Sequence, residues 1–265
     1  NIIIVILIIA LLTLLTILII NPDTDNVRKP LVLTPKVQMQ KVSADEVNVS
    51  YAPEVPKPAQ RSDQRIFEVH IEVLENVCDV DPKNNTKFDT WGYRIKGDEE
   101  VVCGVPGPVL RGRVGDIARI TLTNLNGNKY PHNIDFHAVT GQGGGAKALV
   151  VAPGETATVD VRLLYSGAFM YHCAYGDVPK HIAHGMYGTF IVDPEIPLPE
   201  VDHEWAITQS EWYLKDSNNN DTSELDRDAL IDEEPSVITF NGRTDALAGD
   251  NSLNMQVGER GRIYF

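Results

Sequence analysis

Ile66-Phe67-Glu68-Val69-His70-Ile71-Glu72-Val73 most directly indicates the fold, because apolar side chains alternate with other residues along it. Such alternation over this length is typical of a strand with one buried face. The pattern returns at 118–122 and 156–161, and turn residues separate the runs at 105–108, 126–127 and 152–155. No long helical period occurs between residues 64 and 195. The sequence therefore predicts an all-β protein, with an antiparallel Greek-key β-sandwich over residues 64–195.

Residues 1–63 differ from the sandwich in composition. Residues 2–20 are apolar except for two threonines, and a helix of that length spans the ~30 Å hydrocarbon layer of a bilayer. We interpret 1–20 as a retained single transmembrane anchor, with a buried core helix as the alternative. Residues 21–63 carry six prolines among polar residues, which favours extended chain. We therefore expect a Pro-rich tether that holds the globular part at the extracytoplasmic surface of the membrane.

A weak internal echo follows the sandwich. Residues 258–265 resemble residues 115–122, and each segment follows a turn-rich stretch. The echo predicts that a second domain of the same kind begins at about residue 201. We expect this second domain, over 201–265, to be incomplete, so that further chain or another chain completes it.

The chain of 265 residues has a formal net charge of −14. This acidity argues against nucleic-acid binding, because phosphates would be repelled. Residues 200–234 hold twelve Asp and Glu against two Lys and Arg, and so carry most of the negative charge. We interpret this stretch as a solvated surface, with a docking face for a basic electron donor as the alternative.

Residues that can bind a metal are concentrated in the second half of the sandwich. Five of the seven histidines lie between residues 132 and 184, together with one cysteine and, just after them, a methionine. Because side chains alternate faces along a strand, His172 and Cys173 point to opposite sides, as do His132 and His137. Two groups are therefore predicted: His132, Cys173, His181 and Met186, and Asp135, His137 and His172. His184 is interpreted as a structural or supporting residue.

The two groups differ in chemistry. Two imidazoles, a thiolate and a thioether form the ligand set of an electron-transfer copper, whereas a structural zinc takes four strong ligands. The second group leaves a bound metal open to substrate, and Asp135 could pass protons to a bound molecule. The alternative for His137 and His172 is that they are satisfied polar groups at an interface.

Four segments resemble the copper-containing nitrite reductases: 132–141, the Gly143-Gly144-Gly145 loop, 171–174 and 185–188. The resemblance covers about residues 64–265 and implies a two-domain cupredoxin enzyme. The chain differs from the multicopper oxidases, which use His-x-His pairs and a His-Cys-His run. It has no His-x-His pair in the first segment, and Ala174 follows His172-Cys173 where the last histidine of that run would lie.

The resemblance implies a role for each predicted ligand. His132, Cys173, His181 and Met186 would hold a type 1 copper, and His137 and His172 a type 2 copper where nitrite is reduced to nitric oxide. The link between Cys173 and His172 would carry the electron, and Asp135 would be the catalytic proton donor.

The resemblance also implies partners. The expected assembly is a homotrimer or larger membrane assembly with the type 2 copper at subunit interfaces, and a small redox protein is the electron donor. The third type 2 histidine would come from a neighbouring subunit, from a part of the second domain beyond residue 265. A second histidine for proton delivery is implied where this chain has Val237.

Two alternatives stay open. One is a non-enzymatic type 1 copper electron-transfer or structural subunit of a membrane assembly, which Val237 and the incomplete second domain favour. The other is a different oxidase or reductase on the same scaffold. Outside the predicted sites, Cys78 and Cys103 remain. They either form a disulfide that closes a loop of about 25 residues or stay unpaired and buried.

Overall fold

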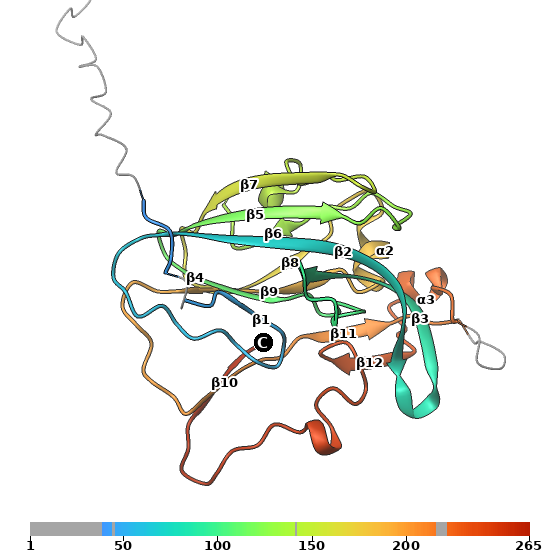
Figure 1. Cartoon of the computed structure of the whole chain (residues 1–265). Coiled ribbons are helices and arrows are strands. Elements are labelled where there is room, and N and C mark those ends of the chain that lie inside the picture. Colours follow the sequence, from blue (N-terminus) through green and yellow to red (C-terminus); the bar gives the residue numbers. More distant parts are fainter. Residues whose placement is uncertain (1–38, 44–45, 141, 216–221) are drawn as a thin grey trace, which may run out of the picture. The chain divides into compact units, whose positions relative to one another are not determined.

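The computed structural model of the chain describes residues 39–43, 46–140, 142–215 and 222–265 (Figure 1). The predicted anchor at 1–20 and the tether as far as residue 38 lie outside the described residues. Among the residues that are described, no helix is long and apolar enough to cross a membrane.

Two sheets lie one over the other and form the predicted sandwich (Figure 1). One sheet has the order β3-β2-β5-β7, with bounds β2 Ile66–Asp81, β3 Thr86–Ile95, β5 Ile117–Asn124 and β7 Thr156–Arg162. The other has the order β1-β4-β9-β8-β6, with bounds β1 Val49–Ser50, β4 Val109–Arg113, β6 Asp135–Phe136, β8 Gly167–His172 and β9 Tyr187–Asp193. Alternate residues of β5, namely Ala118, Ile120 and Leu122, are fully buried in the core between the sheets. The alternation quoted from the sequence thus marks the inner face of the sandwich.

The sandwich is not purely antiparallel, which corrects the prediction. β2 runs parallel to β5, and β4 runs parallel to β9, while the neighbouring pairs β2–β3, β5–β7 and β8–β9 are antiparallel. The chain leaves β2, passes through β3 and β4, and only then returns beside β2 as β5. Such a long connection brings two strands of the same direction together, and alternation within each strand carries no information about it.

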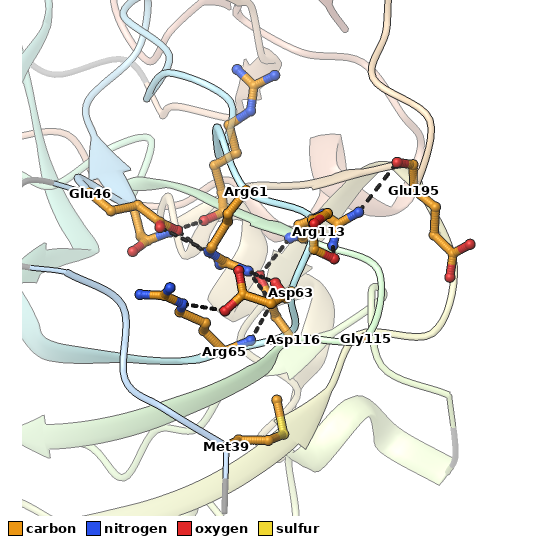
Figure 2. A network of polar contacts seen from close by, with 12 residues as sticks. Met39, Glu46, Arg61, Asp63, Arg65, Arg113, Gly115, Asp116 and Glu195 are labelled. Atoms are coloured by element: carbon orange, nitrogen blue, oxygen red, sulfur yellow. Dashed lines mark hydrogen bonds and ion pairs between the residues drawn. The ribbon is translucent and has the colours of Figure 1, made fainter. Parts of the chain in front are cut away.

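Part of the predicted tether, residues 39–43 and 46–63, is described by the structure, and it lies against the sandwich, where the Val42 amide donates to the Ile66 carbonyl. Val49 and Ser50 form β1 on the edge of the five-stranded sheet, paired with β4. The Arg61 guanidinium donates to both carboxylate oxygens of Asp116 and to both of Glu46, each at 2.9 Å (Figure 2). We call residues 46–63 the strap. Proline and polar composition predicted extended chain, which the strap is, but not that its polar groups pair with buried partners.

The segment from residue 201 forms two small sheets. β10 (His203–Ala206) pairs parallel with β13 (Gly261–Tyr264), and β11 (Gln209–Trp212) pairs antiparallel with β12 (Val237–Phe240). The first segment of the sequence echo covers most of β5 and the second contains β13, and each of these strands is the second strand of a parallel pair.

The remaining elements are short. They are the helices α2 (Val178–Ala183) and α3 (Arg227–Ile231), and the 3-10 turns η1 (Pro82–Asn84), η2 (Gln142–Gly145) and η3 (Gly249–Asn251).

Two features connect distant parts of the chain. The buried side chains of Val109, Ile191, Ala206 and Tyr264 form a small apolar cluster between the five-stranded sheet and the β10–β13 pair. Cys78 on β2 and Cys103 form a disulfide, which settles the alternative left open by the sequence. Among the described residues Cys173 is the free cysteine, and it is buried.

Candidate metal centres

Three ligand atoms of the first predicted group meet in the interior of the sandwich. The Nδ1 of His181 lies 3.2 Å from the Cys173 sulfur and 3.2 Å from the Nδ1 of His132. The Nδ1 of His132 lies 3.9 Å from the same sulfur. All three side chains are buried, and their ligand atoms lie within 4.8 Å of one another. We call this group, together with Met186, the Cys173 site.

Four separate parts of the chain bring these residues together. His132 is paired with Val151 in an isolated bridge, and Cys173 directly follows β8. His181 lies in α2, and Met186 directly precedes β9. The Met186 amide donates to the His181 carbonyl, and the Cys173 amide donates to the Met186 carbonyl. The Met186 side chain is fully buried in the same core cluster as Cys173.

The ring orientation of His132 follows from its outer partner. Its Nε2 lies 3.0 Å from Oε1 of Glu75, whose side chain is only 5% exposed. Burial alone would raise the pKa of Glu75, but hydrogen bonds from His132 and from the amides of Tyr130 and Lys129 hold it below its usual value. An ionised carboxylate can only accept, so Nε2 carries the proton and the Nδ1 lone pair faces Cys173 and His181.

Burial shifts the acid–base behaviour of the other two residues. It raises the pKa of the Cys173 thiol, and it lowers the pKa of His181 to about 4. In both cases burial disfavours the charged form of the side chain. The result is a neutral imidazole, which is the form that binds metals, beside a thiol whose thiolate needs a nearby cation.

Aromatic rings surround the Cys173 site. The Trp91 ring contacts His181 and His132, with centroid distances of 4.9 and 5.4 Å. The Lys180 ammonium lies 5.2 Å from the Trp91 centroid and 5.0 Å from that of Tyr130. His184 stacks on Trp91 at 4.0 Å, and its Nδ1 donates to the Asp89 carbonyl at 2.7 Å. His184 therefore has the supporting place that the sequence indicated.

The second predicted group meets at the edge of the five-stranded sheet. The Nε2 atoms of His137 and His172 lie 3.1 Å apart, and Asp135 is the residue opposite His172 in the β6–β8 pair. The ligand atoms of the three residues lie within 4.8 Å of one another. His137 is exposed and the other two are half-buried, so a small molecule can reach this group. We call it the His172 site.

The His172 ring is also oriented by its outer nitrogen. Nδ1 lies 3.0 Å from the backbone carbonyl of Cys173, which can only accept a hydrogen bond. Nδ1 therefore carries the proton, and Nε2 is the nitrogen available to a metal. The same dipeptide thus supplies His172 to one site and Cys173 to the other.

The glycine loop after β6 closes against Asp135. Gly144 has a positive φ of 44°, and a Cβ there would lie 2.1 Å from an Asp135 carboxylate oxygen and 2.5 Å from backbone atoms of Phe136. Only glycine permits this approach. The loop that helped to carry the family resemblance therefore forms one wall beside Asp135.

Three residues around the Cys173 site were not predicted from the sequence: Glu75, Trp91 and Lys180. Glu75 and Trp91 are register partners on β2 and β3, far from the histidine-rich segment along the chain. One signal could have indicated Glu75, namely an acidic residue directly after the apolar pair Val73-Leu74 in a strand. The contacts of Trp91 with Lys180 and His181 join β3 to α2, and residue spacing does not predict which elements meet.

Val237, the residue at the position of an implied histidine, is the first residue of β12. It pairs with Trp212 and packs against a cluster of Val80, Phe88 and Trp212. The structure therefore gives it a packing role.

A Greek-key sandwich with these two ligand groups defines a cupredoxin-type metalloprotein. A family model described as multicopper oxidase matches residues 79–195. The chain is 39% identical over 216 residues to a copper-containing nitrite reductase of Neisseria meningitidis, covering 81% of this chain and 53% of the relative. The chain belongs to the family of copper-containing nitrite reductases.

Solved structures agree with this assignment. A copper nitrite reductase from Nitrosomonas europaea has a TM-score of 0.61 and 31% identity, covering 75% of this chain and 66% of that one. A Cu-containing nitrite reductase from Thermus scotoductus has a TM-score of 0.57 and 25% identity, covering 76% and 43%. The chain spans about half the length of the curated relatives it matches.

Proposed function

We propose that this chain is part of a membrane-anchored copper nitrite reductase that reduces nitrite to nitric oxide. The observation that carries the proposal is the dipeptide His172-Cys173, whose side chains enter two different groups of metal-binding atoms. Two linked sites of different chemistry suit a reaction in which one site receives an electron and the other uses it.

The donor atoms fit copper at both places. The Cys173 site offers one sulfur and two imidazoles in a buried setting, with Met186 beside them, and this set suits copper better than zinc. The His172 site offers two imidazole nitrogens and a nearby carboxylate, and it is open on the side of His137. Imidazole suits copper, and an open position suits a small anionic substrate.

Copper would pass single electrons at the Cys173 site and hold nitrite at the His172 site. Reduction of nitrite to nitric oxide and water consumes one electron and two protons. Cys173 and His172 are covalent neighbours, so the electron has a short bonded path between the sites. The Asp135 carboxyl lies beside both imidazoles and can hand a proton to an oxygen of nitrite.

The rest of the assembly follows from the sequence and the family resemblance. The apolar segment 2–20 anchors the chain in a membrane, with the globular part on the extracytoplasmic side. The chain functions in a homotrimer or larger membrane assembly, in which a neighbouring subunit adds a third imidazole to the His172 site. A small redox protein supplies the electrons.

A second candidate function is electron transfer without nitrite reduction. Val237 favours it, because an apolar side chain cannot deliver a proton where the resemblance implies a histidine. In this case the Cys173 site would still exchange electrons, and the chain would serve as a subunit of a membrane assembly.

Nitric oxide release separates the two candidates. The full-length chain in detergent, loaded with copper and supplied with a reductant, should release nitric oxide from nitrite. A His172→Ala variant should release none while it keeps the visible absorption of the Cys173 site. Absence of nitric oxide from the doubly loaded chain would overturn the enzyme proposal, and screening other small oxidants would then test for a different reductase.

A further inference from the structure

Glu75 is a buried carboxylate that contacts His132 of the Cys173 site, and it lies outside the predicted ligands. Its Oε1 accepts from Nε2 of His132 at 3.0 Å and from the Tyr130 amide at 2.9 Å. Its Oε2 accepts from the Lys129 amide at 3.0 Å. The ligand imidazole and the loop at Lys129 and Tyr130 are thus held by one buried anion.

Through these contacts the Glu75 carboxylate would affect a metal at the Cys173 site in two ways. It fixes the His132 ring so that Nδ1 faces Cys173 and His181, because Nε2–H is the donor to Glu75. It also places a negative charge one imidazole away from the metal position. Since the side chain is 5% exposed, water screens this charge weakly.

We infer that Glu75 is a positioning residue of the Cys173 site, which fixes the tautomer of His132, tightens metal binding and holds the reduction potential of the site low. A fixed negative charge favours the oxidised metal, which carries more positive charge, over the reduced one. The inference rests on the proposed copper at this site.

A purely structural reading of Glu75 makes a different prediction. If the carboxylate only anchored the loop at Lys129 and Tyr130, its loss would lower the stability of the protein and leave the metal properties unchanged. The test must therefore measure potential and affinity besides stability.

The test compares Glu75→Gln with Glu72→Gln. Glu72 lies on the same strand, its side chain is 10% exposed, and it accepts from Arg94 at 2.8 Å, so it is a matched buried carboxylate outside the site. Glu75→Gln should bind Cu(II) about 10–100-fold more weakly in competition with a chelator. Its visible band should bleach at a more positive potential in a redox titration.

Glu72→Gln and Glu75→Asp complete the comparison. Glu72→Gln should lower the melting temperature of the apo-protein but keep the wild-type potential. Glu75→Asp, which keeps the charge, should lie closer to wild type in potential than Glu75→Gln does. The inference is overturned if Glu75→Gln has the wild-type potential and Cu(II) affinity.

A measurement on the unmodified apo-protein covers the case in which Glu75→Gln does not fold. Nitrogen NMR at alkaline pH should show His132 with its proton on Nε2, and a proton on Nδ1 would overturn the inference. This result needs no copper. Failure of the wild-type chain to bind copper would contradict the proposed function, whereas copper binding with an unchanged potential and Cu(II) affinity in Glu75→Gln would contradict only this inference.

Discussion

At the scale of single residues, the chemistry depends on which nitrogen of each histidine faces inward. His132 is held through Nε2 by Glu75, and His172 is held through Nδ1 by a backbone carbonyl. Opposite nitrogens are therefore presented at the two sites, although the residue type is the same. The outer partner decides this, as is usual for metal-binding histidines.

Asp135 is expected to act in proton transfer and not in metal binding. Asp135→Asn keeps the size of the side chain but removes the acid. Nitric oxide production should fall about 10²–10⁴-fold, the usual contribution of a positioned general acid. Copper content, measured by elemental analysis, should remain at the wild-type level.

The control for Asp135 is Asp160→Asn, which removes an exposed carboxylate on β7 paired with Arg119. Its activity should match that of wild type. A loss of copper from Asp135→Asn in proportion to the loss of activity would instead make Asp135 a ligand.

Lys180 is expected to oppose the effect of Glu75 on the Cys173 site. Its ammonium lies over the Trp91 ring, which contacts both ligand imidazoles. Lys180→Met should lower the reduction potential, because removal of a positive charge favours the oxidised metal. It should also reduce the free energy of unfolding by about 0.5–1 kcal/mol through loss of the cation–π contact.

Redox titration of the visible band and chemical unfolding of the apo-protein check these two effects. Lys180→Arg keeps the charge and should retain the wild-type potential. A potential that rises in Lys180→Met would contradict the electrostatic argument.

Much of both sites was predictable at the residue scale. Strand parity predicted that His172 and Cys173, and likewise His132 and His137, serve different groups. The structure brings these residues together in two such groups, although only His172 of the four lies within a strand. The outer partners were not predictable, because Glu75 reaches His132 from a strand 57 residues earlier in the chain. Alternation reports which face a residue occupies but not which distant residue lies opposite.

At the scale of elements, the strap shows how composition can mislead. Its prolines and polar residues indicate a solvated linker, yet Arg61 of the strap forms buried ion pairs with Glu46 and Asp116. The side chain of Asp116 is fully buried, and it accepts from Arg61 and from the amides of Arg65 and Arg113. Because Arg61 in the strap is the cation that balances this buried carboxylate, displacement of the strap would leave Asp116 buried and unpaired.

Removal of the Arg61 guanidinium is expected to destabilise the fold strongly. Arg61→Ala leaves the buried Asp116 carboxylate without its cation, and such a loss typically reduces the free energy of unfolding by about 3–5 kcal/mol. Chemical unfolding followed by tryptophan fluorescence measures this.

The exposed Arg119–Asp160 pair gives the comparison for Arg61. Arg119 and Asp160 are 39% and 45% exposed. Arg119→Ala should therefore lower the free energy of unfolding far less than Arg61→Ala does, because water screens the exposed pair. Equal effects of the two variants would show that the strap is not held by the Arg61 pair.

At the scale of the whole described part, residues 201–265 are joined to the sandwich through a buried arginine. The Arg111 side chain is 2% exposed, and it donates to Asp193 at 2.8 Å and to Glu204 at 2.6 Å. The sequence echo predicted a second region that begins near residue 201. It did not predict this junction, because a single arginine inside β4 has no pattern that marks its partners.

The junction predicts a pH dependence of stability. Burial would raise the pKa of Glu204, but hydrogen bonds from Arg111, Arg262 and Tyr264 and the charge of Arg111 hold it below its usual value of 4.5. A carboxyl with a depressed folded-state pKa contributes stability above pH 4.5 and loses it as the pH falls through the folded-state value. Protection of residues 203–206 from hydrogen exchange should therefore weaken in acid.

Glu204→Gln provides the control for the junction. The variant lacks the titrating group, so its junction should be weaker at neutral pH and less sensitive to acid than that of wild type. An acid response in Glu204→Gln equal to that of wild type would assign the effect to another carboxyl group.

The proposed nitrite reduction depends on cooperation between the two sites through His172-Cys173. The most direct test is a single-turnover experiment in which the copper-loaded, full-length chain is reduced, freed of excess reductant and mixed with nitrite. The visible band of the Cys173 site should return at the rate at which nitric oxide appears, and His172→Ala should remain bleached. Return of the band without nitric oxide, or equally fast return in His172→Ala, would contradict electron transfer between the two sites.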